Sequence, residues 1–143
     1  MNIKRTIATG LTVLTGLGIS YVGLTYLFTP ADTAPGFGLP AWPHGDATGF
    51  LNVKGIRDLV SGIAVLTLLA TRQRRALGWL MLAESLTPLG DAIIVLGHGG
   101  SAATAYGVHG ATAVAVAAAG ALLLAERRAV PAEGRQALPA LTA

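Results

Sequence analysis

Four apolar runs, each long enough to cross a bilayer as a helix, divide the sequence. They cover residues 6–28, 51–70, 76–96 and 105–125. A membrane-spanning helix needs roughly 20 apolar residues to cross about 30 Å of hydrocarbon. Inside lipid the backbone polar groups must be satisfied within the segment, which a helix achieves. The sequence therefore predicts an all-α fold, a bundle of four transmembrane helices.

Composition favours a membrane protein over a soluble one. The 143 residues are 52% hydrophobic and 12% charged, whereas soluble domains carry about 25% charged residues. Lys and Arg separate the apolar runs and do not form one basic face, so no nucleic-acid partner is expected. Cysteine is absent, which excludes disulfides and thiolate metal sites. We expect one membrane domain over residues 1–128 and a disordered cytoplasmic tail over 129–143.

The first apolar run has two interpretations. Lys4 and Arg5 precede it, as basic residues precede the core of a secretory signal peptide. A signal core is only roughly 7–15 residues long, and this run is longer. We therefore expect the run to remain in the protein as a membrane-anchoring helix.

The distribution of basic residues predicts the orientation. Eight of the ten Lys and Arg residues lie before the first run, between the second and third, or after the fourth. They are Lys4, Arg5, Arg72, Arg74, Arg75, Arg127, Arg128 and Arg135. The connections 29–50 and 97–104 contain neither Lys nor Arg. By the positive-inside rule both termini are expected in the cytoplasm, in a multi-pass protein of the plasma membrane.

The connection 29–50 is rich in residues that break helices and strands. It contains Pro30, Pro35, Pro40 and Pro43 and several glycines. Such a segment forms neither a regular helix nor a central strand. Its apolar side chains Phe37, Leu39 and Trp42 favour an ordered outer loop that packs over the mouth of the bundle, and a flexible tether is the alternative.

Small residues in two runs indicate close helix packing. Gly16 and Ser20 are four apart, and Ala113, Ala117 and Ala121 form a stripe at the same spacing. Small residues allow helices to approach closely in lipid. We expect both features to be structural.

Ionisable residues within the runs are the most informative, because charges at membrane depth are costly and often functional. Lys54, Arg57 and Asp58 share one helix face by their spacing. Glu84 and Asp91 share a face of the third helix, which Pro88 is expected to kink. A rise of about 1.5 Å per residue, counted from the outer helix ends, gives the depth of each polar group in the membrane. Tyr21 and four ionisable groups lie within roughly 6–10 Å of the outer membrane surface. The four are Arg57, Asp58, Asp91 and His109.

These depths predict a pairing. An unpaired Arg57 in the membrane would be costly, and Asp91 is the only acid of another helix at its level. We therefore expect Arg57 to pair with Asp91, and Asp58 and His109 to border the same cavity. Such a pair can simply hold helices in register, or it can belong to an acid–base site. Glu84 lies deeper, near the middle of the bundle.

Several short motifs resemble a known family. They are Phe37-Gly38-Leu39-Pro40, Lys54-Gly55-Ile56-Arg57-Asp58-Leu59 with Gly62, and Pro88-Leu89-Gly90-Asp91-Ala92. Over about residues 6–126 the chain resembles a family of small four-helix membrane proteins described as a domain of unknown function. The resemblance implies a four-helix membrane fold. Some fungal relatives look like small membrane epoxide hydrolases or cyclases of natural-product pathways.

The residues and the resemblance together suggest an acid–base enzyme acting on a lipophilic small molecule by epoxide hydrolysis, cyclisation or isomerisation. Candidate catalytic residues are Asp58, Asp91, Arg57, His109 and Glu84. Candidate substrate-binding residues are Lys54, Tyr21, Tyr106 and Asn52. The alternatives are a structural or accessory membrane protein and a proton-coupled transporter centred on Glu84. A homodimer is compatible with each of these functions.

No cofactor or metal is expected from the motifs. His44, His98, His109 and Asp46 could converge at the outer mouth, but no two of these histidines lie on one helical turn. Neither a phosphate-binding loop nor a dinucleotide fingerprint is present. Ser61 and Ser85 lack the context of a nucleophile elbow. The expected partners are a lipophilic substrate and membrane lipid.

The predicted orientation can be tested with reporter fusions. A reporter fused after Arg74 should report a cytoplasmic location, because the basic residues around it are expected to stay inside. A fusion within the connection 29–50 should report the opposite side. An external location for the segment around Arg74 would contradict the predicted topology.

Overall fold

The computed structural model describes residues 3–126, and every regular element in this part of the chain is helical. The all-α prediction is therefore confirmed for the described residues. The tail predicted over 129–143 lies outside them, as do Arg127, Arg128 and Arg135.

Four long helical rods follow the four apolar runs closely. The first is α1 (Ile3–Phe28), and the second is α3 (Gly49–Ala70). The third combines α4 (Arg74–Glu84) with α5 (Leu86–Gly97). The fourth combines α6 (Ala102–Thr104), the π-helix η3 (Ala105–Gly110) and α7 (Ala111–Leu124). Short elements fill the first connection: α2 (Pro30–Thr33), η1 (Ala34–Phe37) and η2 (Gly45–Thr48).

Three of the four rods are long and apolar enough to cross a membrane. They are Ile3–Phe28, Arg74–Gly97 and Ala102–Leu124. The remaining rod, α3, has sufficient length but contains Lys54, Arg57 and Asp58. Length and composition thus support three of the four predicted spans, and the charges of α3 set it apart.

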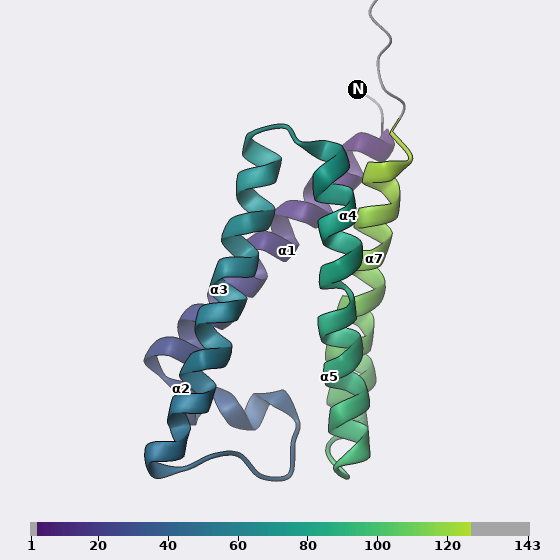
Figure 1. Ribbon diagram of the computed structural model, residues 1–143. Helices are drawn as coiled ribbons and strands as arrows, with labels where there is room; N and C mark the ends of the chain where they lie inside the picture. The colour runs from purple at the N-terminus through teal and green to yellow at the C-terminus, as the bar shows by residue number, and fades with distance from the viewer. Residues whose placement is uncertain (1–2, 127–143) are drawn as a thin grey trace, which may run out of the picture.

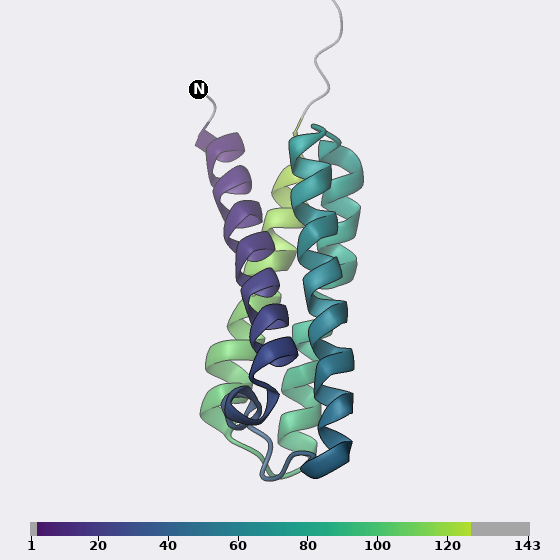
Figure 2. The same ribbon diagram turned by 90° about the vertical axis from the view of Figure 1, so that its left-hand side faces the viewer.

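The rods form two pairs that diverge (Figures 1 and 2). Helix α1 packs along α3, and α4 and α5 pack along α7 and η3, while α1 also contacts α7. A tight connection, residues 71–73, joins α3 to α4, and α3 has no extended contact with α5. The start of α1, this connection and the end of α7 lie at one end of the bundle, here called the inner end (Figure 1). The segment 29–48 lies at the opposite, outer end.

Glycines set the separation of α1 and α3. A Cβ atom on Gly55 would lie 2.8 Å from the carbonyl oxygen of Gly23 and 2.9 Å from the amide nitrogen of Leu27. A Cβ on Gly23 would lie 2.7 Å from the carbonyl oxygen of Gly55. The two backbones therefore touch directly, an approach that only small residues permit. Gly16 and Gly62, each seven residues from one of these glycines, repeat the contact one level further in.

The main apolar core lies toward the inner end. It joins residues of α1, α3, α4 and α7, namely Ala8, Val65, Leu77, Met81, Val116, Ala119 and Leu123. On α7 the buried side runs through Ala113, Val116 and Ala119, while Ala121 is exposed. The predicted stripe Ala113, Ala117 and Ala121 is therefore wrong at Ala121, whereas Ala117 is half-buried. Its four-residue steps drift around the helix, and the mixed three- and four-residue steps of the observed face follow the helical period.

The third rod is interrupted at Ser85, between α4 and α5. Pro88 has no amide hydrogen, so the carbonyl of Glu84 four residues earlier loses its usual helical partner. The Ser85 hydroxyl turns back to donate to the carbonyl of Leu82 at 2.7 Å. The disturbance predicted from Pro88 thus takes the form of an interruption one turn before the proline.

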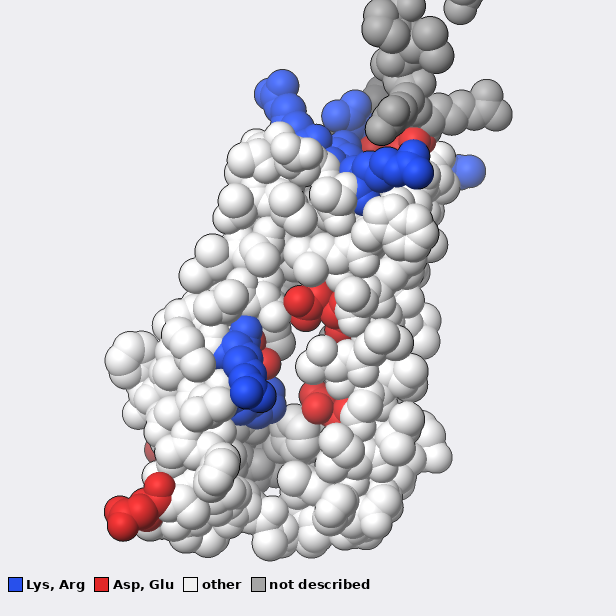
Figure 3. All heavy atoms as spheres, in the orientation of Figure 1, with Lys and Arg blue, Asp and Glu red and all other residues white. Residues whose placement is uncertain are grey.

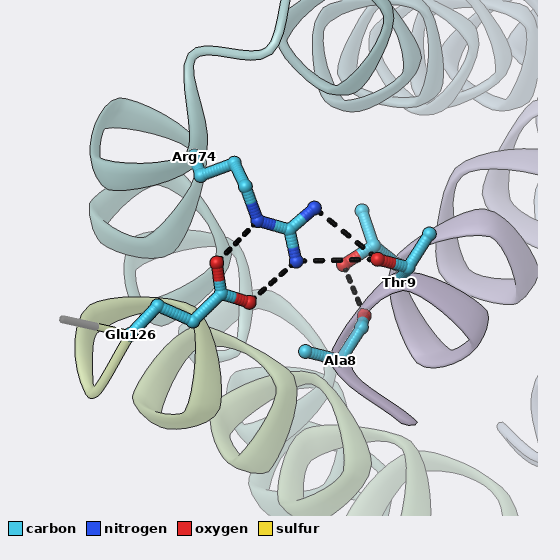
Figure 4. A network of polar contacts seen from close by, with 5 residues as sticks. Ala8, Thr9, Arg74 and Glu126 are labelled. Carbon is cyan, nitrogen blue, oxygen red and sulfur yellow. Dashed lines mark hydrogen bonds and ion pairs between the residues drawn. The ribbon is translucent and has the colours of Figure 1, made fainter. Parts of the chain in front are cut away.

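An arginine ties three rods together at the inner end (Figure 4). Arg74 Nε and Nη2 each donate to the Glu126 carboxylate at 2.5 Å, and both Nη atoms lie 3.2 Å from the Thr9 hydroxyl. A bidentate arginine–carboxylate pair combines charge with fixed geometry. This network holds the start of α4 against α1 and the residues after α7.

The outer loop packs onto the bundle. Phe37 and Leu39 contact an apolar cluster of Ala92, Val95 and Ala105. The Gly38 carbonyl accepts a hydrogen bond from the Ser101 amide at 2.8 Å, which joins the loop to the connection after α5. Trp42 is half-buried, and its ring lies beside His44 at the loop surface. Phe37 and Leu39 thus anchor the loop.

Substitution of Gly55 tests the close contact of α1 and α3. Gly55→Ala should lower the free energy of unfolding by about 1–3 kcal/mol, because the added methyl group meets backbone atoms that cannot move aside. Gly18→Ala is the matched control, since a Cβ at Gly18 has no atom within 4 Å. The measurement is thermal unfolding of the purified proteins in detergent. Equal melting temperatures for the two variants would contradict the proposed contact.

Candidate functional site

A hollow between α3 and the α4–α5 rod carries charged side chains midway along a surface that is otherwise charged mainly at its two ends (Figure 3). Basic side chains border it on the α3 side and acidic side chains on the opposite side. The only Lys and Arg residues of α3 are Lys54 and Arg57, and the only acidic residues of α4 and α5 are Glu84 and Asp91. The hollow follows from the divergence of the two helix pairs, because α3 and α5 do not pack together.

On the α3 side, Lys54 pairs with Asp58 one turn later. Lys54 Nζ lies 2.5 Å from Asp58 Oδ2, and Asp58 is only 7% exposed. The ammonium also lies 4.8 Å from the centre of the Tyr26 ring and 5.4 Å from that of Phe37. Cation–π contacts of this length are favourable, above all where water is excluded. Lys54 is therefore satisfied by one carboxylate and two aromatic rings.

On the opposite side, His109 faces both the outer loop and α5. Its Nε2 lies 2.9 Å from the Phe37 carbonyl oxygen, and its Nδ1 lies 3.9 Å from Asp91 Oδ2. His109 is 9% exposed and belongs to the π-helix η3. Single π-helical turns within α-helices are frequent at functional sites, because the extra residue changes the direction of nearby side chains.

The Phe37 carbonyl fixes the protonation pattern of the imidazole. A carbonyl oxygen only accepts, so Nε2 must carry the hydrogen of this bond. In the neutral ring Nδ1 then holds a lone pair that faces Asp91. A proton on the Asp91 carboxyl group can move to this nitrogen once the 3.9 Å separation shortens. His109 and Asp91 thus form a couple suited to proton transfer.

The two pairs belong to one electrostatic cluster. The Phe37 ring links them: its centre lies 5.4 Å from Lys54 Nζ and 4.7 Å from the centre of the His109 ring. The structure therefore brings together Lys54, Asp58, Asp91 and His109 from three rods, at the level that helix depth indicated.

The predicted Arg57–Asp91 pair is not formed. Arg57 is exposed and has no hydrogen bond or ion pair with any residue from 3 to 126. Lys54 and Asp58 take the inward direction, and Arg57, one residue before Asp58, is turned about 100° away from it around the helix. Asp91 faces His109 instead.

Of the four predicted substrate-binding residues, only Lys54 belongs to the acid–base cluster. Tyr21 and Tyr106 are 69% and 68% exposed. Asn52 Nδ2 donates to the carbonyls of Tyr26 and Leu27 at 3.1 and 3.0 Å, so it caps the end of α1. The tyrosine of the cluster is Tyr26, at 3% exposure, which sequence reasoning missed because it lies within an uncharged run.

Glu84 lies about 10 Å further along the third rod than Asp91, by helical rise. It is half-buried and forms no hydrogen bond or ion pair with the described residues. It precedes the interruption at Ser85 directly, and its own carbonyl is the one that Pro88 leaves without a helical partner.

The remaining histidines lie apart from the cluster. His44 and His98 are exposed, as is Asp46. Within residues 3–126 no group of three or more His, Cys, Asp or Glu side chains is arranged to hold a metal ion.

The fold and the cluster define a helical protein with apolar, membrane-length helices and a polar hollow between diverging helix pairs. The chain belongs to the family described as "Domain of unknown function (DUF4267)", whose model matches residues 16–123. The match covers α3, both pairs of the cluster and the outer loop. No curated protein and no solved structure matches the chain.

Removal of one partner tests the Lys54–Asp58 pair. Lys54→Met should destabilise the protein by about 3 kcal/mol, because it leaves the buried Asp58 carboxylate without its counter-charge. The double variant Lys54→Met/Asp58→Asn should recover part of this loss. Arg57→Met serves as the control and should change stability by less than about 0.5 kcal/mol. Thermal unfolding in detergent measures all three, and full additivity in the double variant would exclude a coupled pair.

Proposed function

We propose that this protein is a membrane-embedded acid–base enzyme acting on a lipophilic small molecule. The observation that carries the proposal is the arrangement of two acid–base pairs in one hollow, Lys54 with Asp58 and His109 with Asp91. Charged groups in an apolar bundle are costly and tend to mark functional sites. A site that opens sideways between helices suits a substrate dissolved in the bilayer.

Epoxide hydrolysis is the reaction class that we favour. Asp91, as a carboxylic acid, donates its proton to the ring oxygen as the carbon–oxygen bond of the ring breaks. A water molecule forms the new carbon–oxygen bond and gives a proton to Asp58 Oδ1, the oxygen that Lys54 does not occupy. The product is a diol. The site is restored when Asp58 releases its proton to solvent and Asp91 takes up one proton from solvent, which His109 Nδ1 can pass on. Proton transfer by the same groups would also serve a cyclase or an isomerase.

We further propose that the bundle crosses the plasma membrane four times, with both ends in the cytoplasm. Basic side chains gather at the inner end of the bundle (Figure 3). The segment 29–48 at the outer end contains neither Lys nor Arg. This asymmetry supports the orientation predicted from the sequence. The packing of α3 along α1 supports the fourth span, because α1 covers one side of a helix that carries charges.

Glu84 supports a second candidate, a proton-coupled transporter. It is a half-buried acid without a described partner, and it precedes an interrupted helix. Transporters commonly place their ion and substrate sites at such interruptions. In this case uptake would depend on a proton gradient, and Glu84→Gln would abolish it.

Substitution of Asp91 tests the enzyme proposal. Asp91→Asn should lower turnover of a lipophilic epoxide by about 10²–10⁴-fold, the contribution typical of a general acid. The measurement is incorporation of ¹⁸O from labelled water into the diol. His109→Gln should also slow the reaction, because the return of the proton is lost.

The matched control is Asp46→Asn, which removes an exposed acid of the outer loop and should leave turnover unchanged. Each variant must elute from a sizing column as the wild type does. If Asp91→Asn keeps full turnover, the proposed site is wrong. If no turnover occurs but uptake follows a proton gradient, the transporter is the better description.

A further inference from the structure

Of the two Lys and Arg residues in the outer half of the described bundle, Lys54 has an acidic partner and Arg57 has none. Lys54 pairs with Asp58, and His109 faces Asp91, so each carboxylate of the cluster has a basic neighbour. Arg57 has no hydrogen bond or ion pair with any residue from 3 to 126, and its side chain is exposed. A guanidinium stays charged under all ordinary conditions and is costly at membrane depth without a counter-charge. In the proposed four-span topology Arg57 lies at membrane depth, so its counter-charge comes from outside the described residues.

The level of Arg57 indicates where that counter-charge lies. Arg57 is eight residues after Gly49, the first residue of α3, which places it about 12 Å from the outer end of the helix. Asp91 is six residues before Gly97, the last residue of α5, or about 9 Å from its outer end. An anion at Arg57 would thus lie at the level of the acid–base cluster, deeper than the phosphates of a phospholipid layer.

The hollow beside α3 suits the hydrocarbon part of a ligand. Basic side chains of α3 border it directly, and most of the surface around it is uncharged (Figure 3). An uncharged wall suits hydrocarbon, and a few placed polar groups fix the orientation of a ligand. The guanidinium fork matches the two oxygens of a carboxylate. A single molecule that carries both an acid group and a hydrocarbon body satisfies both features.

We infer that Arg57 binds the carboxylate of a lipophilic carboxylic acid whose hydrocarbon part occupies the hollow between α3 and α5. This deepens the proposed function by naming its substrate class. It rests on that proposal for the membrane span of α3 and for the claim that the bound acid reacts. Arg57 is then a specificity residue. It fixes one end of the substrate while the Asp91–His109 couple acts further along the molecule.

Photolabelling tests the inference without requiring catalysis. The full-length protein is placed in nanodiscs of phosphatidylcholine and exposed to palmitic acid bearing a diazirine, or to the methyl ester of the same probe. The acid should label peptides of α3 or α5, and Arg57→Gln should reduce labelling about tenfold or more, as expected for loss of a charge-assisted hydrogen bond. Arg57→Lys should retain part of the labelling. The methyl ester should label weakly in every variant.

Arg75→Gln is the matched control, because Arg75 is also exposed, has no hydrogen bond or ion pair with residues 3–126, and lies at the inner end. It should label as the wild type does. Equal labelling by the acid and the ester, or full labelling of Arg57→Gln, would overturn the inference. Phosphatidic acid that competes as well as palmitic acid would also overturn it, by assigning Arg57 to a phospholipid head group.

Binding of the acid probe and the proposed enzymatic reaction can be tested separately. Arg57→Gln should still reduce labelling when it is added to Asp91→Asn, since Asp91→Asn removes the reacting acid and leaves Arg57 in place. Turnover of a neutral epoxide without labelling by the acid probe would overturn this inference and leave the proposed enzyme standing. Labelling that depends on Arg57, without turnover of any epoxide acid, would support the binding site and count against the reaction.

Discussion

The direct backbone contact between α1 and α3 determines the shape of the rest of the bundle. Gly23 and Gly55 bring the two helices together at the outer half, so that α3 follows α1 along its length. The other helices form a second pair, in which α4 and α5 pack on α7 and η3. The two pairs share the main apolar core toward the inner end, and α3 and α5 diverge beyond the tight connection at 71–73. The hollow with its charged groups is the direct result.

The outer end is closed by a few specific hydrogen bonds that also build the site. The Phe37 carbonyl accepts from His109, and the neighbouring Gly38 carbonyl accepts from the Ser101 amide. The bond to His109 both holds the loop and decides which imidazole nitrogen faces Asp91. The Phe37 ring also lies near the Lys54 ammonium. The loop is therefore a wall of the cluster, and changes in loop packing are expected to alter the acid–base groups.

Much of the fold could be predicted from the sequence, because helix boundaries depend on local features. Apolar run length located the four rods to within a few residues, and Pro88 indicated the interruption at Ser85. Depths estimated from the helical rise also predicted that Asp58, Asp91 and His109 lie at one level of the bundle. The Arg57–Asp91 pair was wrong because spacing tells which residues share a face, but not how far a helix is rotated about its axis. That rotation depends on the contact with α1. The π-helix around His109 and the role of Tyr26 likewise depend on tertiary contacts and have no local signal.

Arg74 at the inner end and Arg57 in the outer half of α3 differ in a way that bears on function. Arg74 uses Nε and both Nη atoms, on Glu126 and Thr9, and thereby fixes the junction of three rods. The chain can therefore satisfy a guanidinium fully where the arginine holds helices together. Arg57, in the outer half of α3, is exposed and has no hydrogen bond or ion pair with the described residues, a costly state for a charge within the proposed membrane span. An arginine that only holds helices together is expected to have its donors occupied, as those of Arg74 are. The contrast separates an arginine that stabilises the fold from one whose donors are available to a ligand.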